Sequence, residues 1–177
     1  MEIKECLETR RSTRKYEYEP ISKETIEDIV KAGQQAPSWK NSQTPRYYVA
    51  LSDEARERVH SCLPDFNKER TEGVGAFIIT TVKKGRSGCD RDGVYFSHLG
   101  NGYECFDNGL AVENMILYAH SLGYSTLIMG LYDEKSLREY LSAPNDEDLV
   151  VVIALGKKDT EPTKPERKPL DTILKIF

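Results

Sequence analysis

Apolar positions along the chain form two patterns: continuous runs, which are typical of buried strands, and residues three or four positions apart, which are typical of helices. Short continuous apolar runs predict strands at residues 47–51, 76–82, 125–130 and 148–155. Apolar residues at helical spacing predict helices at about residues 3–11, 22–36, 53–63, 106–122 and 133–141. Ser22, Asp53 and Asp133 are residue types that cap helices, so we expect them at helix N-termini. Strands that alternate with helices favour a layered α/β or α+β fold.

The helix predicted at residues 106–122 has apolar side chains around nearly its whole circumference. Such a helix must be buried on all sides, which in a chain of 177 residues indicates a subunit interface as well as a core. Residues 83–103, before it, are rich in glycine and charge and show no period. A long irregular segment in a compact domain is typical of a functional lid or a partner contact. Residues 65–75 are also predicted to be polar and irregular.

The end of the chain divides into two contrasting segments. Residues 157–169 are rich in proline and charge, which predicts an extended segment without a core of its own. Residues 170–177 turn apolar again, so we expect them to dock on another surface, for which a second subunit is a reasonable place. We expect one domain, residues 1–177, in which residues 157–177 form an extended C-terminal arm.

Composition excludes several classes of function. A net charge of -4 argues against general nucleic-acid binding, and no apolar run approaches the length of a membrane span. The first residues lack the apolar core of a signal peptide, so we expect a cytoplasmic protein. The cysteines and histidines show no metal-ligand spacing, which argues against a metal site and leaves a Cys–His nucleophile pair as a weak alternative. We expect Cys6 and Cys62 to pack in the core.

The densest group of candidate binding residues is the stretch Thr-Arg-Arg-Ser-Thr-Arg-Lys at residues 9–15. Guanidinium groups offer forked, charge-assisted donors, and a hydroxyl adds another, so the stretch suits a phosphate. The alternative is a solvated helix end, where Arg10 and Arg11 favour the negative pole of the helix dipole. The stretch alone leaves both interpretations open.

Three more groups of residues follow in a fixed order. They are Ala36-Pro37-Ser38 with Asn41 and Gln43, the run from Asp107 to Met115, and Arg167-Lys168-Pro169-Leu170 in the arm. Together with residues 10–14 this ordered set, from about Glu5 to Leu170, resembles the FMN-dependent nitroreductase family of flavin oxidoreductases. No single motif is diagnostic, and the order of the set carries the resemblance.

The resemblance implies a three-layer α+β fold, with a mostly antiparallel central sheet flanked by helices. It also implies an intertwined homodimer, in which the apolar helix forms the dimer core and the C-terminal segment reaches the partner. Two FMN molecules would lie at the interface, each held by residues of both subunits. We therefore expect FMN as cofactor and a second copy of the chain as partner.

The resemblance also implies roles for individual residues at the phosphate end of FMN. Arg10 and Ser12 would hold the phosphate and ribityl region, and Arg11 would add backbone contacts. Arg14 would reach the N1/O2 edge of the flavin. Arg167, from the arm, would add a second charge at the phosphate.

A second set of residues would surround the flavin ring. The residues expected from the other subunit are Pro37, Ser38, Trp39 and Asn41. Asn67 and Arg70 match, more weakly, an Asn-x-x-Lys pair at the ring edge. The backbone of Met129 and Gly130 would point at flavin N5 and O4. Trp39 stands where a small residue is common in the family, so we expect it to reshape the ring environment or the substrate floor.

The implied activity is that of an NAD(P)H-dependent FMN oxidoreductase that reduces nitroaromatics, quinones or similar acceptors by a ping-pong mechanism. The chemistry would take place at flavin N5 with electrostatic support from Arg14, and no protein acid or base would be required. Two alternatives are a different reaction on the same fold, reductive dehalogenation or flavin fragmentation, and a non-enzymatic flavin-binding regulator. The sequence does not choose between NADH and NADPH. Candidates for a pocket that holds the 2′-phosphate of NADPH are Lys83, Lys84 and Arg86.

Several of these residues have simpler alternative roles. Arg14 could pair with Glu17 or Glu19 at the surface. The alternative for Asn41 and Gln43 is that they stabilise their own loop and do not contact the flavin. The aromatic residues that could form a lid over the flavin, or simply pack, are Tyr95, Phe96, Tyr103 and Phe106.

Overall fold

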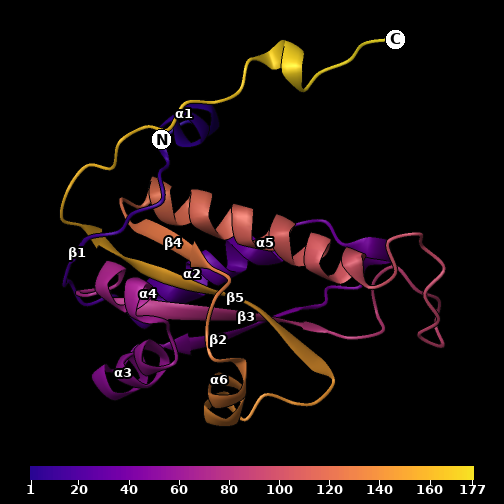
Figure 1. Ribbon diagram of the computed structural model, residues 1–177, viewed down its shortest axis with the longest axis horizontal. Helices are drawn as coiled ribbons and strands as arrows, with labels where there is room; N and C mark the ends of the chain where they lie inside the picture. Colours follow the sequence, from indigo (N-terminus) through magenta and orange to yellow (C-terminus); the bar gives the residue numbers. More distant parts are fainter.

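One antiparallel sheet organises the chain (Figure 1). The computed structural model describes residues 1–177. The main strands lie in the order β2 (Pro45–Ala50), β3 (Ala76–Lys83), β5 (Glu147–Lys158) and β4 (Ser125–Met129). A short strand, β1 (Tyr16–Glu17), pairs with the end of β5, and every strand pairing is antiparallel. The predicted α+β class with an antiparallel central sheet is confirmed, and four of the five strands correspond to predicted ones.

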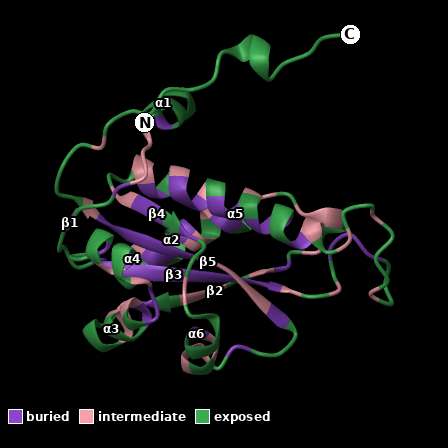
Figure 2. Ribbon diagram, in the orientation of Figure 1, coloured by how far each residue is buried: buried purple, intermediate pink, exposed green.

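The sheet separates two cores because successive residues of a strand face opposite sides. On β3, Phe77 and Ile79 pack toward α3 (Asp53–Ser61) and α6 (Glu134–Leu141). The intervening Ala76 and Ile78 pack toward the other face of the sheet, together with buried residues of α2 (Lys23–Gln34) and α5 (Gly102–Ser121). Figure 2 shows β3 and β5 as the most continuously buried strands. The result is three layers, with the sheet between two layers of helices.

Capping side chains fix two of the predicted helix starts. Ser22 and Asp133 each accept a hydrogen bond at 3.1 Å from the backbone N–H three residues further on, as predicted. The prediction for α3 is wrong by one residue. There Ser52 is the cap, with an acceptor distance of 3.2 Å, and Asp53 is the first helical residue. Asp53 suits that place because its charge faces the positive end of the helix dipole.

Residues 65–75 are not wholly irregular, which corrects the prediction. They begin with α4 (Asp65–Arg70), directly after Pro64. Proline is restricted to extended backbone here and ends the preceding segment. The helix has only six residues and no apolar stripe, since Phe66 is 44% exposed and Asn67 is the one buried residue. The apolar period therefore could not reveal it.

Helix α5 begins four residues earlier than predicted and is not buried all round. Its buried face includes three polar residues, Glu104, Asp107 and Asn108, beside the apolar ones. Phe106 and Tyr118 are 55% and 38% exposed, so large apolar side chains of α5 remain open in the single chain. Figure 2 shows exposed segments along the length of this helix. None of the helices combines the length and apolar content that a membrane span would need.

The C-terminal arm extends from the body, as predicted, although its first two residues still belong to β5. It passes near α1 (Ile3–Thr9) in the view of Figure 1 and ends beyond it, with one short turn, η2 (Leu170–Thr172). Figure 2 shows the arm as exposed, and Ile173 and Ile176 are 68% and 86% exposed. Apolar side chains at such exposure are typical of a segment that packs against a partner.

Candidate functional site

The arginine stretch runs along the free edge of β4. Ser12 forms a parallel bridge with Thr126, and the N–H of Thr13 donates to the carbonyl of Thr126 at 3.0 Å. The other edge of β4 is paired with β5, so this contact adds the stretch to the sheet. The backbone of Ser12 is therefore fixed by the sheet, close to the beginning of β4.

The side chain of Arg11 has a structural role. Its guanidinium donates to the carbonyls of Arg10 and Glu8, both at 2.6 Å. These carbonyls lie at the C-terminal end of α1, where unpaired acceptors and the negative pole of the helix dipole attract a cation. The solvated-helix-end interpretation is therefore partly right, but only for Arg11.

Arg10 and Arg14 lack such partners. The guanidinium of Arg14 makes one long hydrogen bond, of 3.4 Å, to the carbonyl of Ser12, and that of Arg10 makes none. Neither forms an ion pair, and Glu19, one of the expected partners of Arg14, lies 3.8 Å from Lys157 instead. In a chain of net charge -4, two guanidinium groups without carboxylate partners are available to an anion.

The environment of His120, a half-buried residue near Arg10, shows the local excess of positive charge. His120, near the end of α5, lies 2.8 Å from the hydroxyl of Thr9 through Nε2. Burial lowers the pKa of His120 below its usual value, and the charges of Lys158, Arg10 and Arg11 lower it further. The surroundings of the imidazole thus disfavour a further positive charge.

A second group of predicted residues meets at the other end of β4. Asn67, 4% exposed, donates from Nδ2 to the carbonyl of Leu131 at 3.4 Å. That carbonyl comes two residues after Met129, the last residue of the strand. Met129 lies three strand residues, or about 10 Å, from the position of Thr126. Arg70 does not join by hydrogen bonds, because its guanidinium lies 5.3 Å above the ring of Phe66.

The Pro37–Gln43 segment forms a tight turn with unusual backbone angles. It contains the 3-10 turn η1 (Trp39–Asn41), and the hydroxyl of Ser38 accepts from the N–H of Gln43 at 3.0 Å. Lys40, Asn41 and Gln43 have φ angles of 46, 56 and 48 degrees. Residues other than glycine rarely adopt this left-handed region, and such strain is concentrated at functional sites.

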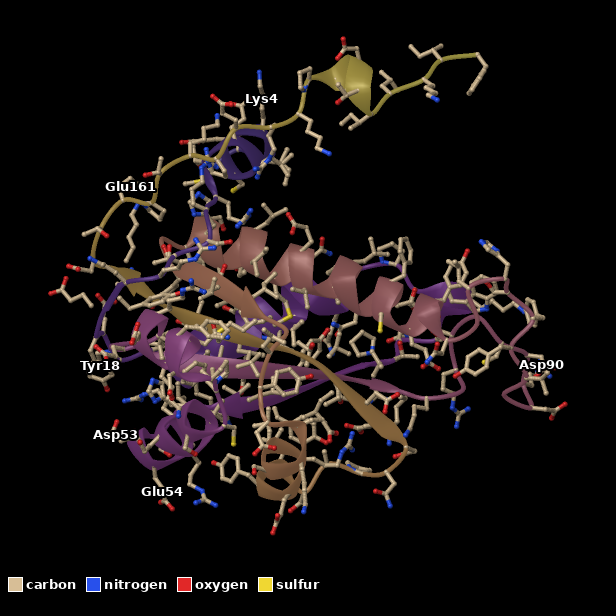
Figure 3. The ribbon with its side chains drawn as sticks, in the orientation of Figure 1. Lys4, Tyr18, Asp53, Glu54, Asp90 and Glu161 are labelled. Atoms are coloured by element: carbon tan, nitrogen blue, oxygen red, sulfur yellow. The ribbon has the colours of Figure 1, made fainter.

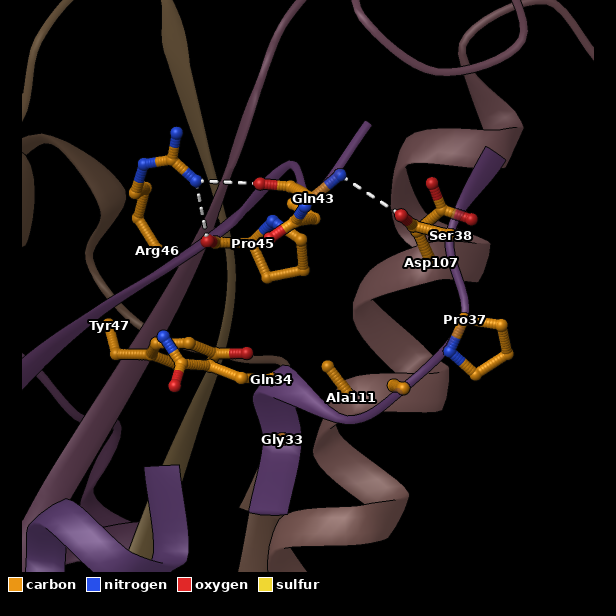
Figure 4. A pocket seen from close by; sticks show the side chains of 11 residues that line it. Gly33, Gln34, Pro37, Ser38, Gln43, Pro45, Arg46, Tyr47, Asp107 and Ala111 are labelled. Carbon is orange, nitrogen blue, oxygen red and sulfur yellow. Dashed lines mark hydrogen bonds between the residues drawn. The ribbon is translucent and has the colours of Figure 1, made fainter. Parts of the chain in front are cut away.

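A cavity of about 410 Å³ opens beside this turn (Figure 4). Arg46 forms part of its wall and donates to the carbonyls of Gln43 and Pro45 at 2.8 and 2.9 Å. The residues that line the cavity are Gly33, Gln34, Ala36, Pro37, Ser38, Gln43, Pro45, Arg46, Tyr47, Asp107 and Ala111. Its volume lies within the range of small-molecule sites. Pro37 and Ser38, which are predicted to line a flavin ring, therefore lie in the wall of a cavity large enough for a small molecule.

Two buried carboxylates on α5 hold the surrounding loops, and the sequence patterns predicted no role for either of them. Asp107 accepts from the N–H of Trp39 at 3.0 Å and from the hydroxyl of Ser87 at 2.7 Å. Glu104 accepts from the N–H of Gly85 at 2.6 Å and from the hydroxyl of Tyr95 at 2.8 Å. The signal in the sequence was an acidic residue at a buried position of an otherwise apolar helix, which requires hydrogen-bond partners.

Aromatic side chains gather around Trp39. Its ring centroid lies 4.5 Å from that of Tyr103 and 5.7 Å from that of Phe96, and Phe106 packs edge-on against Tyr103. Tyr95 is not part of this cluster, because its hydroxyl bonds to Glu104. The indole Nε1 of Trp39 is buried without a hydrogen-bond partner. Three of the four aromatic residues considered for a lid, Phe96, Tyr103 and Phe106, thus pack together with Trp39.

The two halves of the predicted site lie far apart in one chain. Asp107 holds the Trp39 turn near the beginning of α5, whereas His120 contacts the end of α1 near the end of α5. Thirteen residues of helix correspond to about 20 Å. Figure 1 shows α1 and the loop before α5 at opposite ends of that helix. Arg167 lies in the exposed arm and forms no hydrogen bond or ion pair with the rest of the chain.

The comparisons with known proteins agree with this architecture. Residues 7–157 match the model of the Nitroreductase family. A relative from Archaeoglobus fulgidus, named as a candidate NADH dehydrogenase/NAD(P)H nitroreductase, is 30% identical over 161 residues, covering 87% of this chain and 86% of the relative. A candidate NAD(P)H nitroreductase from Bacillus subtilis is 25% identical over 96% of this chain and 94% of its own length.

Solved structures share the fold over the whole chain. A candidate nitroreductase from Exiguobacterium sibiricum, in complex with FMN, superposes with a TM-score of 0.87 at 22% identity, covering 100% of this chain and 98% of that one. A candidate NAD(P)H:FMN oxidoreductase from Staphylococcus epidermidis gives a TM-score of 0.86 at 21% identity, covering 99% and 96%. The protein is thus an α+β protein with one antiparallel sheet and an arginine-rich strand edge. It belongs to the nitroreductase family, as the sequence predicted.

Proposed function

We propose that the protein is an FMN-dependent oxidoreductase that uses NADH or NADPH to reduce nitroaromatics, quinones or similar acceptors by a ping-pong mechanism. The observation that carries the proposal is the pair of guanidinium groups, Arg10 and Arg14, that the edge of β4 positions without carboxylate partners. The relatives named NAD(P)H nitroreductase and the FMN complex of the Exiguobacterium protein support the choice of cofactor and electron donor.

The donors along the edge of β4 and at its end would fit the two ends of FMN. At the beginning of the strand, Arg10 and Ser12 would hold the phosphate and ribityl region, with the backbone of Arg11 beside them. The hydroxyl of Thr13 is buried there without a partner, which adds an unused donor to the group. Arg167 would bring a further charge from the arm.

At the end of β4, other donors would surround the ring. Asn67 already lies beside the strand end, where Met129 and Gly130 present their backbone. Arg70 is one turn further along α4 and would join by leaving the face of Phe66. Arg14 carries a fixed positive charge, which stabilises negative charge that develops beside it.

The chemistry that FMN supplies when bound is two-electron transfer from a reduced nicotinamide to an acceptor. The chain then has to bind and orient both substrates and exclude competing reactions. Glu104 and Asp107 are engaged in holding loops, so we assign no protein group as acid or base and expect water to deliver protons. Donor and acceptor would use the same open face in turn.

We propose that the working unit is a homodimer in which each site is completed by the partner. The Pro37–Asn41 turn lies about 20 Å along α5 from the arginine stretch, and no hydrogen bond within the chain joins it to Asn67 at the end of β4. The exposed apolar side chains of α5 and the apolar arm supply surfaces for such a dimer. From the partner, Pro37, Ser38, Trp39 and Asn41 would line the ring. We further propose a single cytoplasmic domain, residues 1–177, with residues 157–177 as the arm.

Spectroscopy of the purified protein tests the proposal directly. The protein should be yellow as isolated or after addition of FMN, and the colour should bleach with NADH or NADPH in the absence of oxygen. Adding a nitroaromatic or a quinone should restore the colour. A protein that takes up no FMN contradicts the proposal, and bound FMN that neither nicotinamide reduces would favour a flavin-binding regulator. Release of halide from halogenated phenols, or loss of flavin under oxygen, would favour the other reactions.

A further inference from the structure

We propose that a basic cavity beside the Trp39 turn binds the 2′-phosphate of NADPH, so that the enzyme prefers NADPH to NADH. The cavity has a volume of about 450 Å³. Its lining includes Trp39, Lys40, Arg86, Cys89 and Arg91. This inference rests on the proposed function, because it names the electron donor of the same site.

Ion pairing removes two of the three cations that the sequence suggested for this role. Lys83 contacts Asp146 at 2.8 Å and Glu147 at 3.2 Å. Lys84 contacts Asp148 at 3.3 Å. Both ammonium groups are thus directed toward β5 and the turn before it. Arg86, by contrast, forms no ion pair or hydrogen bond and lines the cavity.

Two further cations join Arg86 from separate parts of the sequence. Arg91 comes from the same segment, and Lys40 comes from the Trp39 turn, where its left-handed backbone places it on the cavity wall. Lys40 Nζ lies 5.1 Å from the ring centroid of Phe96 and has no carboxylate partner. Asp90 is the one acidic residue of the lining, and its Oδ1 accepts from two backbone N–H groups, both at 2.9 Å.

The cavity wall is a folded structure. The segment before α5 is fixed to that helix through Glu104, which binds the N–H of Gly85, and through Asp107, which binds Ser87. An antiparallel β-bridge between the backbones of Cys89 and Tyr95 closes the loop. Asp90 lies near the outer end of this loop (Figure 3). These contacts bury Cys89 and Ser87, so the segment that carries Arg86 and Arg91 has a fixed backbone conformation.

Electrostatics at Cys89 supports the convergence of these cations. Burial raises the pKa of the Cys89 thiol, and the charges of Glu104 and Asp90 raise it further. The charges of Arg86 and Lys40 act in the opposite direction on the same thiol. Two cations from segments that are distant in sequence therefore lie close to one buried group.

A phosphate monoester fits this cavity better than a carboxylated acceptor does. It carries nearly two negative charges near neutral pH, whereas a carboxylate carries one, and three cations without partners line the cavity. Forked guanidinium donors also match phosphate geometry. The Ser38–Gln43 turn lies between this cavity and the one that contains Pro37 and Ser38. A nicotinamide near the flavin and a 2′-phosphate in the basic cavity would thus contact the same turn from two sides.

Calorimetry with nucleotide fragments tests the site without any redox reaction. Adenosine 2′,5′-bisphosphate should bind the FMN-loaded protein at least tenfold more tightly than 5′-AMP. The double variant Arg86→Gln/Arg91→Gln should lose that difference, and the Lys84→Gln variant should keep it, since Lys84 is paired with Asp148. Equal binding of the two nucleotides by the unmodified protein would overturn the proposal.

Stopped-flow reduction under anaerobic conditions gives the second readout. The ratio of reduction rate to apparent dissociation constant should be at least tenfold higher for NADPH than for NADH, and the double variant should lower it for NADPH alone. If the double variant instead weakens reduction of 4-nitrobenzoate and leaves NADPH unaffected, the cavity serves the acceptor and the proposal is wrong. If NADH and NADPH reduce the flavin equally well, the NADPH preference is wrong and the proposed function stands. If the protein binds no flavin, or if neither nicotinamide reduces it, the proposed function itself is wrong.

Discussion

The backbone N–H of Trp39 donates to both carboxylate oxygens of Asp107, at 3.0 Å to Oδ2 and 3.2 Å to Oδ1, across 68 residues of sequence. The same carboxylate accepts from the hydroxyls of Ser87 at 2.7 Å and Ser42 at 3.4 Å. One buried charge on α5 therefore fixes two loops, the Trp39 turn and the segment before the helix. Hydrogen bonds to a charged acceptor are stronger than neutral ones, which offsets the left-handed strain of Lys40 and Asn41.

Replacing Asp107 with asparagine should loosen the Trp39 turn. Asparagine has no charge and replaces one acceptor oxygen with an NH2 donor, to which the N–H of Trp39 cannot donate, so we expect a loss of about 1–3 kcal/mol in the free energy of unfolding. The affinity for FMN should fall by about tenfold, because the turn would line the partner's flavin less precisely. Urea unfolding and FMN titration measure the two effects.

Glu104→Gln is the matched control for Asp107→Asn. Glu104 is also buried on α5, but its partners Gly85 and Tyr95 lie outside the Trp39 turn. The control should lose a similar amount of stability while it keeps the FMN affinity of the unmodified protein. Equal losses of FMN affinity in both variants would mean that the effect is general destabilisation.

Replacing Arg14 or Arg10 with alanine should separate their roles. Arg14→Ala should slow reduction of the flavin by NAD(P)H by about tenfold and leave dimerisation unchanged, because its guanidinium makes only one long bond within the chain. Arg10→Ala should weaken FMN binding by about 10- to 100-fold, the range for losing a charge-assisted hydrogen bond. Anaerobic stopped-flow reduction and FMN titration are the measurements.

Lys15→Ala serves as the control for these two variants. It removes a neighbouring exposed cation whose side chain makes no hydrogen bond or ion pair, and it should change neither quantity. If Arg10→Ala and Arg14→Ala retain full flavin and full activity, the arginine stretch is a solvated helix end after all.

The fold could be predicted to a large extent because its strands are short apolar runs and its long helices have clear apolar faces. β3 and β5 are buried on both sides, so their sequences read as nearly continuous apolar segments. Helix α4 could not be found in this way, since its six residues bury only Asn67. The start of α5 was missed for a similar reason, because Glu104 is buried through hydrogen bonds and not through apolar contact.

The site was harder to predict, because its geometry depends on contacts between distant residues. The sequence indicated that Arg10, Ser12 and Arg14 suit an anion, yet only the structure separates Arg11, which caps α1. Likewise, nothing in the spacing of Lys83 and Lys84 reveals that β5 and the turn before it hold their ion-pair partners. Pairing of this kind is decided by strand register, which single-sequence patterns do not contain.

Removal of residues 170–177 should weaken the dimer. These residues expose several apolar side chains, among them Ile173 at 68% and Ile176 at 86%. Burying two such side chains contributes about 3–6 kcal/mol, so truncation should raise the dimer dissociation constant at least hundredfold. Sedimentation velocity over a range of concentrations measures it. Lys175→Asp, a change of one exposed polar residue in the arm, should have a much smaller effect, and an unchanged dissociation constant after truncation would refute the docking of the arm.

The buried carboxylate of Glu147 should make the stability of the protein depend on pH in the acid range. Burial acts to raise the pKa of Glu147, but hydrogen bonds from Thr81, Tyr48 and Lys83 outweigh it, so that the pKa lies below its usual value. The unfolded chain then binds more protons than the folded one as the pH falls toward the folded pKa, and stability decreases with decreasing pH. The contribution of Glu147 is complete above its unfolded pKa and is lost as the pH falls through the folded pKa.

Glu147→Gln tests this dependence because glutamine is neutral at every pH. At pH 7 the variant should lose about 1–3 kcal/mol in the free energy of unfolding, since the hydroxyl of Thr81, at 2.6 Å, and Lys83 would lose a charged acceptor. As the pH falls below the unfolded pKa and through the lowered folded pKa, the difference from the unmodified protein should shrink, because the unmodified Glu147 itself becomes protonated. Asp148→Asn, which breaks only the half-exposed contact with Lys84, should cost less than about 1 kcal/mol and leave the pH dependence unchanged. A difference for Glu147→Gln that stays constant from pH 7 to pH 3 in urea unfolding would show that the carboxylate charge is not what stabilises this cluster.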